Sequence, residues 1–140
     1  MVRSAIAVLA GIAVLTVASF AIEAAVNPLL LRSFPEALPG PEALSSNSWV
    51  RLLTFTYGLM CVAAGGYVAA RIAQRAPVKH AAAVGILQSG LTVMAMLSPI
   101  GAHASRSVWI ATAILSIPAA LAGGISYKHT CGLQKAPATP

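Results

Sequence analysis

Long apolar stretches separated by short polar segments run along the chain. They cover about residues 4–27, 49–73, 80–98 and 106–127. About 20 helical residues cross the hydrocarbon core of a bilayer, so each stretch is long enough to span a membrane. The stretches are too long for strands and lack the alternation of a barrel. The pattern therefore predicts an all-α membrane protein, with four transmembrane helices in one domain over residues 1–131.

The first apolar stretch also has features of a signal peptide. Arg3 precedes it, and Ser19-Phe20-Ala21 resembles a small-residue cleavage site. However, the apolar run continues past this site toward Asn27, and it is longer than the hydrophobic region of a usual signal peptide. We expect a retained transmembrane helix, with cleavage as the alternative.

Two segments lie outside the predicted helices. The outer loop over residues 32–48 contains Pro-Glu-Ala-Leu twice, at Pro35 and at Pro41. Proline followed by glutamate favours the first turn of a helix, so we interpret this loop as a cover over the mouth of the bundle. Residues 132–140 are polar and contain proline, which predicts a disordered cytoplasmic tail.

The basic residues at the helix ends predict the orientation of the chain, because loops rich in lysine and arginine stay in the cytoplasm. One side has only basic charges, namely Arg3, Arg71, Arg75, Lys79, Lys128 and Lys135, and the other has Arg32, Arg51 and Arg106 with Glu36 and Glu42. We expect the first side to be cytoplasmic. Both termini then face the cytoplasm, and the helices form two antiparallel hairpins.

Composition agrees with a membrane location. Hydrophobic residues make up 58% of the 140 residues and charged residues 9%, and the mean hydropathy is +0.81. About 25% of residues are charged in a soluble domain. The net charge is +6, but the bases flank apolar stretches and are not interleaved with exposed aromatic residues, so we expect no nucleic-acid binding. The expected partner is the lipid bilayer.

Small residues recur every four positions along the predicted helices. On residues 49–73 they are Cys61, Gly65, Ala69 and Ala73, and the later helices add Ala81, Gly85 and Ser89, then Ser116, Ala120 and Gly124. The first helix has Ala7 and Gly11 at the same interval. Such stripes let two helix backbones approach closely in a membrane. We predict that the stripe through Gly65 packs against residues 80–98.

The same region contains a short motif. Gly65-Gly66-Tyr67, then Ala69-Ala70-Arg71, then Pro77 and His80 resemble the GGYxAAR...P..H signature of small, uncharacterised four-helix inner-membrane proteins of bacteria. The resemblance covers about residues 58–90. It implies a four-helix, multi-pass protein of the bacterial inner (cell) membrane, and it implies no biochemical activity.

One acidic residue, Glu23, lies inside a predicted membrane helix. Ser19 and Asn27 are one turn away on either side, so the three form a polar stripe. A carboxylate in a membrane is costly unless it is protonated, paired or close to water. Glu23 can therefore reach the outer boundary or pair with Arg51 or Arg32 as a structural residue. Alternatively, Glu23, Ser19, Asn27 and Arg51 form a proton or cation site.

The remaining polar residues do not indicate catalysis or cofactor binding. His80, His103 and His129 do not share ligand spacing, and Cys61 and Cys131 are too far apart in the predicted topology for a disulfide. The turn with Arg71, Arg75, Lys79 and His80 contains no GxGxxG or GxxxxGK[ST] pattern. We expect no metal, no cofactor and no enzymatic activity, and we interpret this basic turn as a cytoplasmic helix connection.

Two hypotheses for function remain. The first is an assembly or accessory subunit that packs through its small-residue stripes, as a homo-oligomer or within a larger membrane complex. The second is a small proton-coupled transporter that uses Glu23. Small multidrug-resistance transporters are similar in outline, since they also have four helices and a membrane glutamate in the first.

Overall fold

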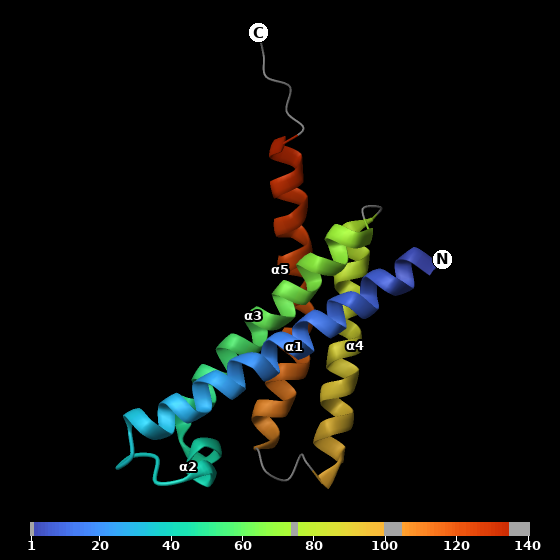
Figure 1. Ribbon diagram of the computed structural model, residues 1–140. Coiled ribbons are helices and arrows are strands. Elements are labelled where there is room, and N and C mark those ends of the chain that lie inside the picture. The colour runs from blue at the N-terminus through green and yellow to red at the C-terminus, as the bar shows by residue number, and fades with distance from the viewer. Residues whose placement is uncertain (1, 74–75, 100–104, 135–140) are drawn as a thin grey trace.

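The computed structural model describes residues 2–73, 76–99 and 105–134, with side chains for 4–73, 76–99 and 105–130. The described chain is helical apart from its turns (Figure 1). Its long helices are α1 (Val2–Ser33), α3 (Ser48–Ala73), α4 (Pro77–Leu97) and α5 (Arg106–Gln134), and the short helix α2 (Pro41–Ser46) lies between α1 and α3. Each of these four long helices is long and apolar enough to cross a membrane, which confirms the predicted all-α class.

Large apolar side chains cover the outside of the helices. Among the most exposed are Leu9, Phe20, Met94, Leu97 and Ile114, each with at least 64% of its surface accessible. In the most apolar part of each candidate span, between 17% and 28% of the residues are buried within the protein. An outer surface this apolar is stable in lipid rather than in water. The chain therefore has the surface of a multi-pass membrane protein.

The helix ends differ from the predicted ends mainly at prolines. Helix α1 continues through Pro28 to Ser33, although the sequence predicted an end at Asn27. Proline removes one hydrogen bond of the helix, and neighbouring helices make such a loss tolerable in a membrane. Helix α4 begins at Pro77 rather than at His80, because proline is well suited to a first helical position.

The C-terminal end differs as well. Helix α5 reaches Gln134, whereas the sequence placed the start of a disordered tail at residue 132. Residues 135–140 of the predicted tail lie outside the described part of the chain.

The long helices are arranged as two crossed pairs. Figure 1 shows α1 and α3 side by side, running obliquely across α4 and α5. Packing is most extensive between α4 and α5 and between α3 and α5, followed by α1 with α3, while α3 and α4 share less contact. Helix α3 thus packs against all three other long helices.

Glycines on α3 set the distance to two of these neighbours. A β-carbon at Gly65 would lie 2.7 Å from the carbonyl oxygen of Gly11 and 3.0 Å from Cβ of Leu15, both on α1. A β-carbon at Gly66 would overlap the backbone of Ala120 on α5. The prediction that Gly65 packs against residues 80–98 is therefore wrong. Successive helical residues point about 100° apart, so adjacent glycines contact two different helices.

A second glycine pair, Gly123 and Gly124 on α5, sets the distance from α5 to α3 and to α4. A β-carbon at Gly123 would overlap the carbonyl of Ala63 on α3, and one at Gly124 would lie 2.5 Å from Cβ of Ala81 on α4. Like Gly65 and Gly66, these glycines lie where a larger residue would separate the helices. Cys61, Ala69, Ala73 and Ala120 of the predicted stripes are buried too.

The small-residue stripes of α4 and α5 contact each other. A β-carbon at Gly85 would lie 2.9 Å from Cα of Ile117 and 3.1 Å from Cβ of Ala120. One turn further along α4, the Ser89 hydroxyl donates to the Ala113 carbonyl oxygen on α5 at 2.6 Å. Close backbone approach and a hydrogen bond between helices thus occur on one face of α4.

The segment between α1 and α3 folds back onto their ends. Leu38 is 1% exposed and packs with Leu30 of α1 and Val50 of α3. Phe34 and Trp49 form an edge-to-face pair with ring centroids 5.6 Å apart. Pro41 starts α2, so the second Pro-Glu-Ala-Leu forms the helical turn that the sequence indicates. This segment holds the ends of α1 and α3 together.

Candidate functional site in a cavity between the helices

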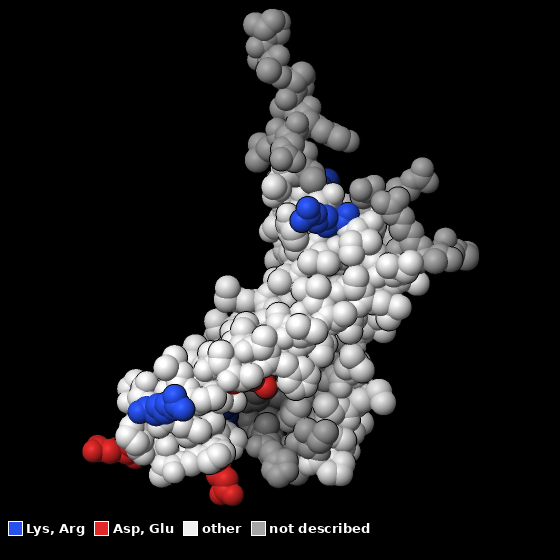
Figure 2. Space-filling view, viewed as in Figure 1, with Lys and Arg blue, Asp and Glu red and all other residues white. Residues whose placement is uncertain are grey.

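All four long helices and α2 contribute to one cavity of about 580 Å³. Most of its wall is apolar, but each long helix adds polar side chains. These are Ser19, Glu23 and Asn27 from α1, Arg51, Thr54 and Tyr57 from α3, Gln88 from α4, and Trp109 and Thr112 from α5. In Figure 2, acidic surface is visible beside a hollow between the helices. A concave, largely apolar site with a few convergent polar groups is typical of small-molecule binding.

The cavity contains all four residues of the predicted proton or cation site. Ser19, Glu23 and Asn27 are spaced by four residues, so α1 presents them on one face, and that face lines the cavity. Arg51 reaches the same cavity from the start of α3. The structure thus brings these four residues together, and their role remains a prediction.

The Glu23 carboxylate lies near Tyr57 rather than in an ion pair. Glu23 and the Thr54 side chain are both close enough to the Tyr57 hydroxyl to interact with it. Within the described residues, no salt bridge connects Glu23 with Arg51, whose Nη2 donates to Ser48 Oγ at 3.4 Å. The proposed structural pairing of Glu23 with Arg51 or Arg32 therefore has no support from the observed contacts.

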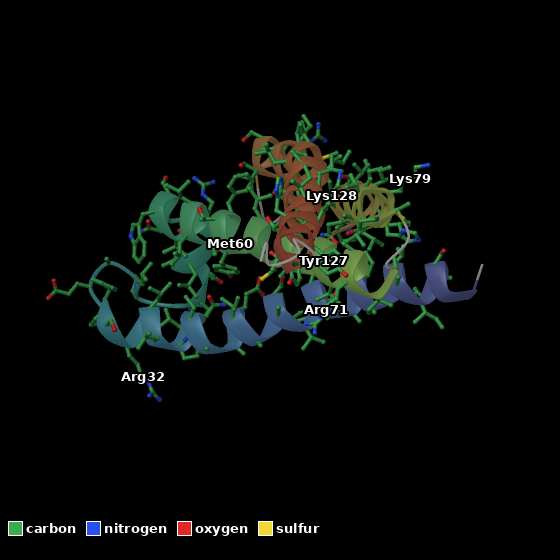
Figure 3. All side chains as sticks on the ribbon, turned by 90° about the horizontal axis from the view of Figure 1, so that it is seen from above. Arg32, Met60, Arg71, Lys79, Tyr127 and Lys128 are labelled. Carbon is green, nitrogen blue, oxygen red and sulfur yellow. The ribbon has the colours of Figure 1, made fainter. Side chains whose placement is uncertain are left out.

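Arg32 points away from this site. It is exposed near the end of α1, and Figure 3 shows its side chain projecting outward from the helices. Glu23 lies ten residues before Ser33, the last residue of α1, which is about 15 Å along a helix axis. The carboxylate is therefore deeper in the helix than an end at Asn27 implied.

Two buried hydrogen-bond donors line the cavity. The Tyr57 hydroxyl and Trp109 Nε1 are inaccessible to solvent and have no hydrogen bond of standard geometry to any described residue. Buried polar groups are usually hydrogen-bonded, and those that are not require an explanation. Trp109 Nε1 can bind a polar group of another molecule after a small side-chain movement, whereas the Tyr57 hydroxyl already has Glu23 and Thr54 beside it. Both donors line the cavity that holds Glu23.

Sequence reasoning did not identify five of the polar cavity residues. They are Thr54, Tyr57, Gln88, Trp109 and Thr112. A signal was present, because a polar side chain in an apolar membrane stretch usually faces the protein interior, and the amide of Gln88 is the clearest case. Nothing in the spacing along one helix, however, indicates which residues of other helices share its cavity.

The basic turn lies apart from this cavity. His80 is in the first turn of α4, and its Nδ1 donates to the Ala76 carbonyl oxygen at 3.1 Å. Ala76 has a left-handed backbone with φ 51°. Arg71 and Lys79 are exposed, and Figure 3 shows both projecting outward. Arg75 lies outside the described residues.

Metal and thiol chemistry have no visible site in the part of the chain that is described. Its histidine, cysteine and acidic residues do not form any group of three that could hold a metal ion. Cys61 is buried as a free thiol. His103 and the Cys131 side chain lie outside the described part. Compared with known protein families, curated proteins and solved structures, the chain gives no match.

Proposed function

We propose that the protein is a small proton-coupled membrane carrier that binds a cationic solute in the cavity around Glu23. The observation that carries this proposal is that Glu23, Tyr57 and polar groups from all four long helices line one cavity. Its volume of about 580 Å³ is within the range of small-molecule sites. No covalent chemistry is part of the proposed exchange.

The chemistry of Glu23 suits an exchange of a proton for a cation. A carboxylate inside a membrane is costly when it is charged and unpaired. It is stable either as the protonated acid or as the anion beside a cation, so one proton leaves when one cation binds. Phe55, Tyr57 and Trp109 also line the cavity, and aromatic faces attract cations. An amphipathic organic cation fits this mixture of groups.

Arg51 limits where the cation can bind. It lines the same cavity, but it is six residues before Tyr57 on α3, which is about 9 Å along the helix. Tyr57 is the residue beside Glu23. The positive charge of Arg51 therefore lies toward the α2 end, while the negative charge lies deeper. This separation favours a solute whose cationic group enters deeply and whose neutral or anionic part stays near Arg51.

The proposal includes an orientation in the bacterial inner membrane. The end of the protein with Arg71, Lys79 and Lys128 faces the cytoplasm, in accord with the positive-inside rule. Both termini are then cytoplasmic, the helices pair as two antiparallel hairpins, and the cavity is nearer the outer side, because α2 contributes Pro41, Leu44 and Ser45 to its wall. The basic charges support this orientation.

The assembly hypothesis receives less support from the contacts. Its motivation was the small-residue stripes, but Gly65, Gly66, Gly85, Gly123 and Gly124 all face other helices of the same chain. These glycines are used within the protein, so they do not indicate an oligomer. Crosslinking in native membranes tests this hypothesis, and capture of a second copy or of a stable neighbour would revive it.

Transport in reconstituted vesicles tests the carrier proposal. The probe is ethidium, a fluorescent amphipathic cation. Vesicles that contain the protein carry an imposed proton gradient, and ethidium is placed on the side from which the exchange would move it. We expect the wild-type protein to move ethidium against the proton flow, and Glu23→Gln to abolish this movement because the side chain can no longer ionise. Glu36→Gln is the matched control, since Glu36 is exposed in the outer segment, and it should transport like wild type.

Binding provides a second readout in detergent. We expect ethidium binding by the wild type to release about one proton per cation, as exchange at a single carboxyl requires. Glu23→Gln should release none. If the wild type neither moves nor binds organic cations, or if Glu23→Gln behaves like Glu36→Gln, the carrier proposal fails.

A further inference from the structure

A second cavity lies between the beginnings of α1 and α4. This groove has a volume of about 580 Å³, and its lining is largely apolar. The lining residues are Ser4, Ala5, Val8, Leu9, Lys79, His80, Ala83 and Leu87. None of them lines the cavity around Glu23. The groove is therefore a separate feature of the fold.

The polar end of the groove lies at the start of α4, and its apolar wall lies further along the same helix. Lys79 and His80 lie in the first turn of α4, and Leu87 lies eight residues after Lys79, which is about 12 Å along the helix. Val8 and Leu9 of α1 supply the facing apolar wall. The groove therefore has a polar end and an apolar wall.

Helices α1 and α4 also contact each other closely through residues that do not line the groove. Ala7 and Val84 are completely buried, and a β-carbon at Gly11 would lie 2.9 Å from Val84 Cγ2. Contact between these two helices is otherwise limited. The groove is open to the surface rather than enclosed.

The charge at this end of the protein is positive. Lys79, Arg71 and Lys128 are exposed there. The three acidic residues of the chain, Glu23, Glu36 and Glu42, lie in the second half of α1 and in the segment between α1 and α3. His80 Nδ1 donates to the Ala76 carbonyl oxygen, so Lys79 is the cationic side chain that lines the groove. The first turn of α4 adds the partial positive charge of a helix start.

We propose that this groove binds an anionic phospholipid. The phosphate contacts the Lys79 ammonium at the start of α4, and an acyl chain lies along Val8, Leu9, Ala83 and Leu87. A lysine in the first turn of a membrane helix reaches the headgroup level, and basic pockets between membrane helices bind anionic headgroups. The polar end of the groove with its cation, followed by an apolar wall, matches the two parts of a phospholipid. The site does not depend on any role of Glu23.

Lipid retention tests this proposal. The purified protein is taken from bilayers that contain phosphatidylglycerol and phosphatidylcholine in equal amounts, and bound lipids are counted by native mass spectrometry. We expect the wild type to retain phosphatidylglycerol in preference to phosphatidylcholine. Lys79→Gln should reduce this preference about five-fold, the size expected for one lysine near an anionic lipid surface. Val8→Trp should reduce retention of both lipids by filling the apolar wall.

Lys128→Gln is the matched control, because Lys128 is a basic residue at the same end that does not line the groove. It should retain phosphatidylglycerol like wild type. Equal retention of the two lipids by the wild type would overturn the proposal. An equal loss in Lys79→Gln and Lys128→Gln would also overturn it, since the preference would then come from general surface charge. Thermal unfolding of each variant in detergent separates a lost site from a lost fold.

Discussion

Gly11 of α1 and Gly65 of α3 pack against each other reciprocally, because a β-carbon at either position would lie 2.7 Å from the carbonyl oxygen of the other. Neither helix can gain even a methyl group here without moving its neighbour. In the sequence of α1, Gly11 precedes Leu15 and Ser19, the first residues of this helix that line the cavity. The two glycines therefore set the spacing of α1 and α3 beside the candidate site.

Gly65→Ala should destabilise the protein through this contact. Overpacking of a close contact costs about 1–3 kcal/mol, and here the obstacle is backbone, which cannot rotate away. Gly90→Ala is the matched control on α4, where an added β-carbon would meet nothing within 4 Å. The control should be neutral or up to about 1 kcal/mol more stable, because alanine favours helix over glycine.

The measurement for this pair is the unfolding midpoint in mixed detergent micelles as the denaturing detergent is increased. Equal midpoints for the two variants would contradict the close approach of α1 and α3.

The hydrogen bond between Ser89 and Ala113 gives a second prediction. Ser89→Ala removes a hydroxyl that donates from α4 to α5 at 2.6 Å. Side-chain hydrogen bonds between membrane helices contribute about 0.6 kcal/mol on average and up to about 1.7, and we expect a loss in that range. In the control Ser126→Ala, the lost hydroxyl donates only to Ala122 of its own helix.

Ser126→Ala should therefore leave stability nearly unchanged in the same unfolding measurement. If the control loses as much stability as Ser89→Ala, the hydrogen bond between the helices does not stabilise the protein more than a bond within one helix.

We expect Leu38 to hold the segment between α1 and α3 in its packed position. It is 1% exposed between Leu30 and Val50, and truncation of a buried leucine to alanine costs about 2–5 kcal/mol. Leu38→Ala should raise amide hydrogen exchange over residues 34–47 while the centres of the long helices stay protected. Leu29→Ala is the control, because Leu29 is 61% exposed. Unchanged exchange in Leu38→Ala would contradict a packed cover.

The proposed orientation predicts which positions are accessible from each side. Ser45 and Ala76 are both exposed, and they lie beside the outer and the basic ends of the helices. With the native cysteines replaced, Ser45→Cys should react with an impermeant thiol reagent added outside cells, and Ala76→Cys should react only after the membrane is opened. Labelling of both positions from the same side would refute the threading.

Hydropathy and helix geometry, both readable from the sequence, determined two features of this protein. The length of the apolar stretches predicted the four long helices, since few other structures can satisfy their backbone in lipid. The spacing of Ser19, Glu23 and Asn27 predicted one polar face, because residues four apart share a helix side. Their common cavity in the structure agrees with that spacing.

The helix ends were predicted less well. The first helix was predicted to end at about residue 27, but α1 continues through Pro28 to Ser33, because the rest of its hydrogen bonds and its packing outweigh the one bond that proline removes.

The partners of each face were decided only by the tertiary structure. Gly65 and Gly85 each belong to a stripe of small residues that recur every four positions. Yet Gly65 contacts α1 and Gly85 contacts α5. Likewise, Tyr57 and Gln88 join Glu23 at one cavity, although neither is near it in the chain. A periodic pattern fixes the face that a residue occupies, whereas the helix opposite that face depends on how all four helices cross. That crossing follows from the summed packing of many small contacts, which no single stretch of sequence contains.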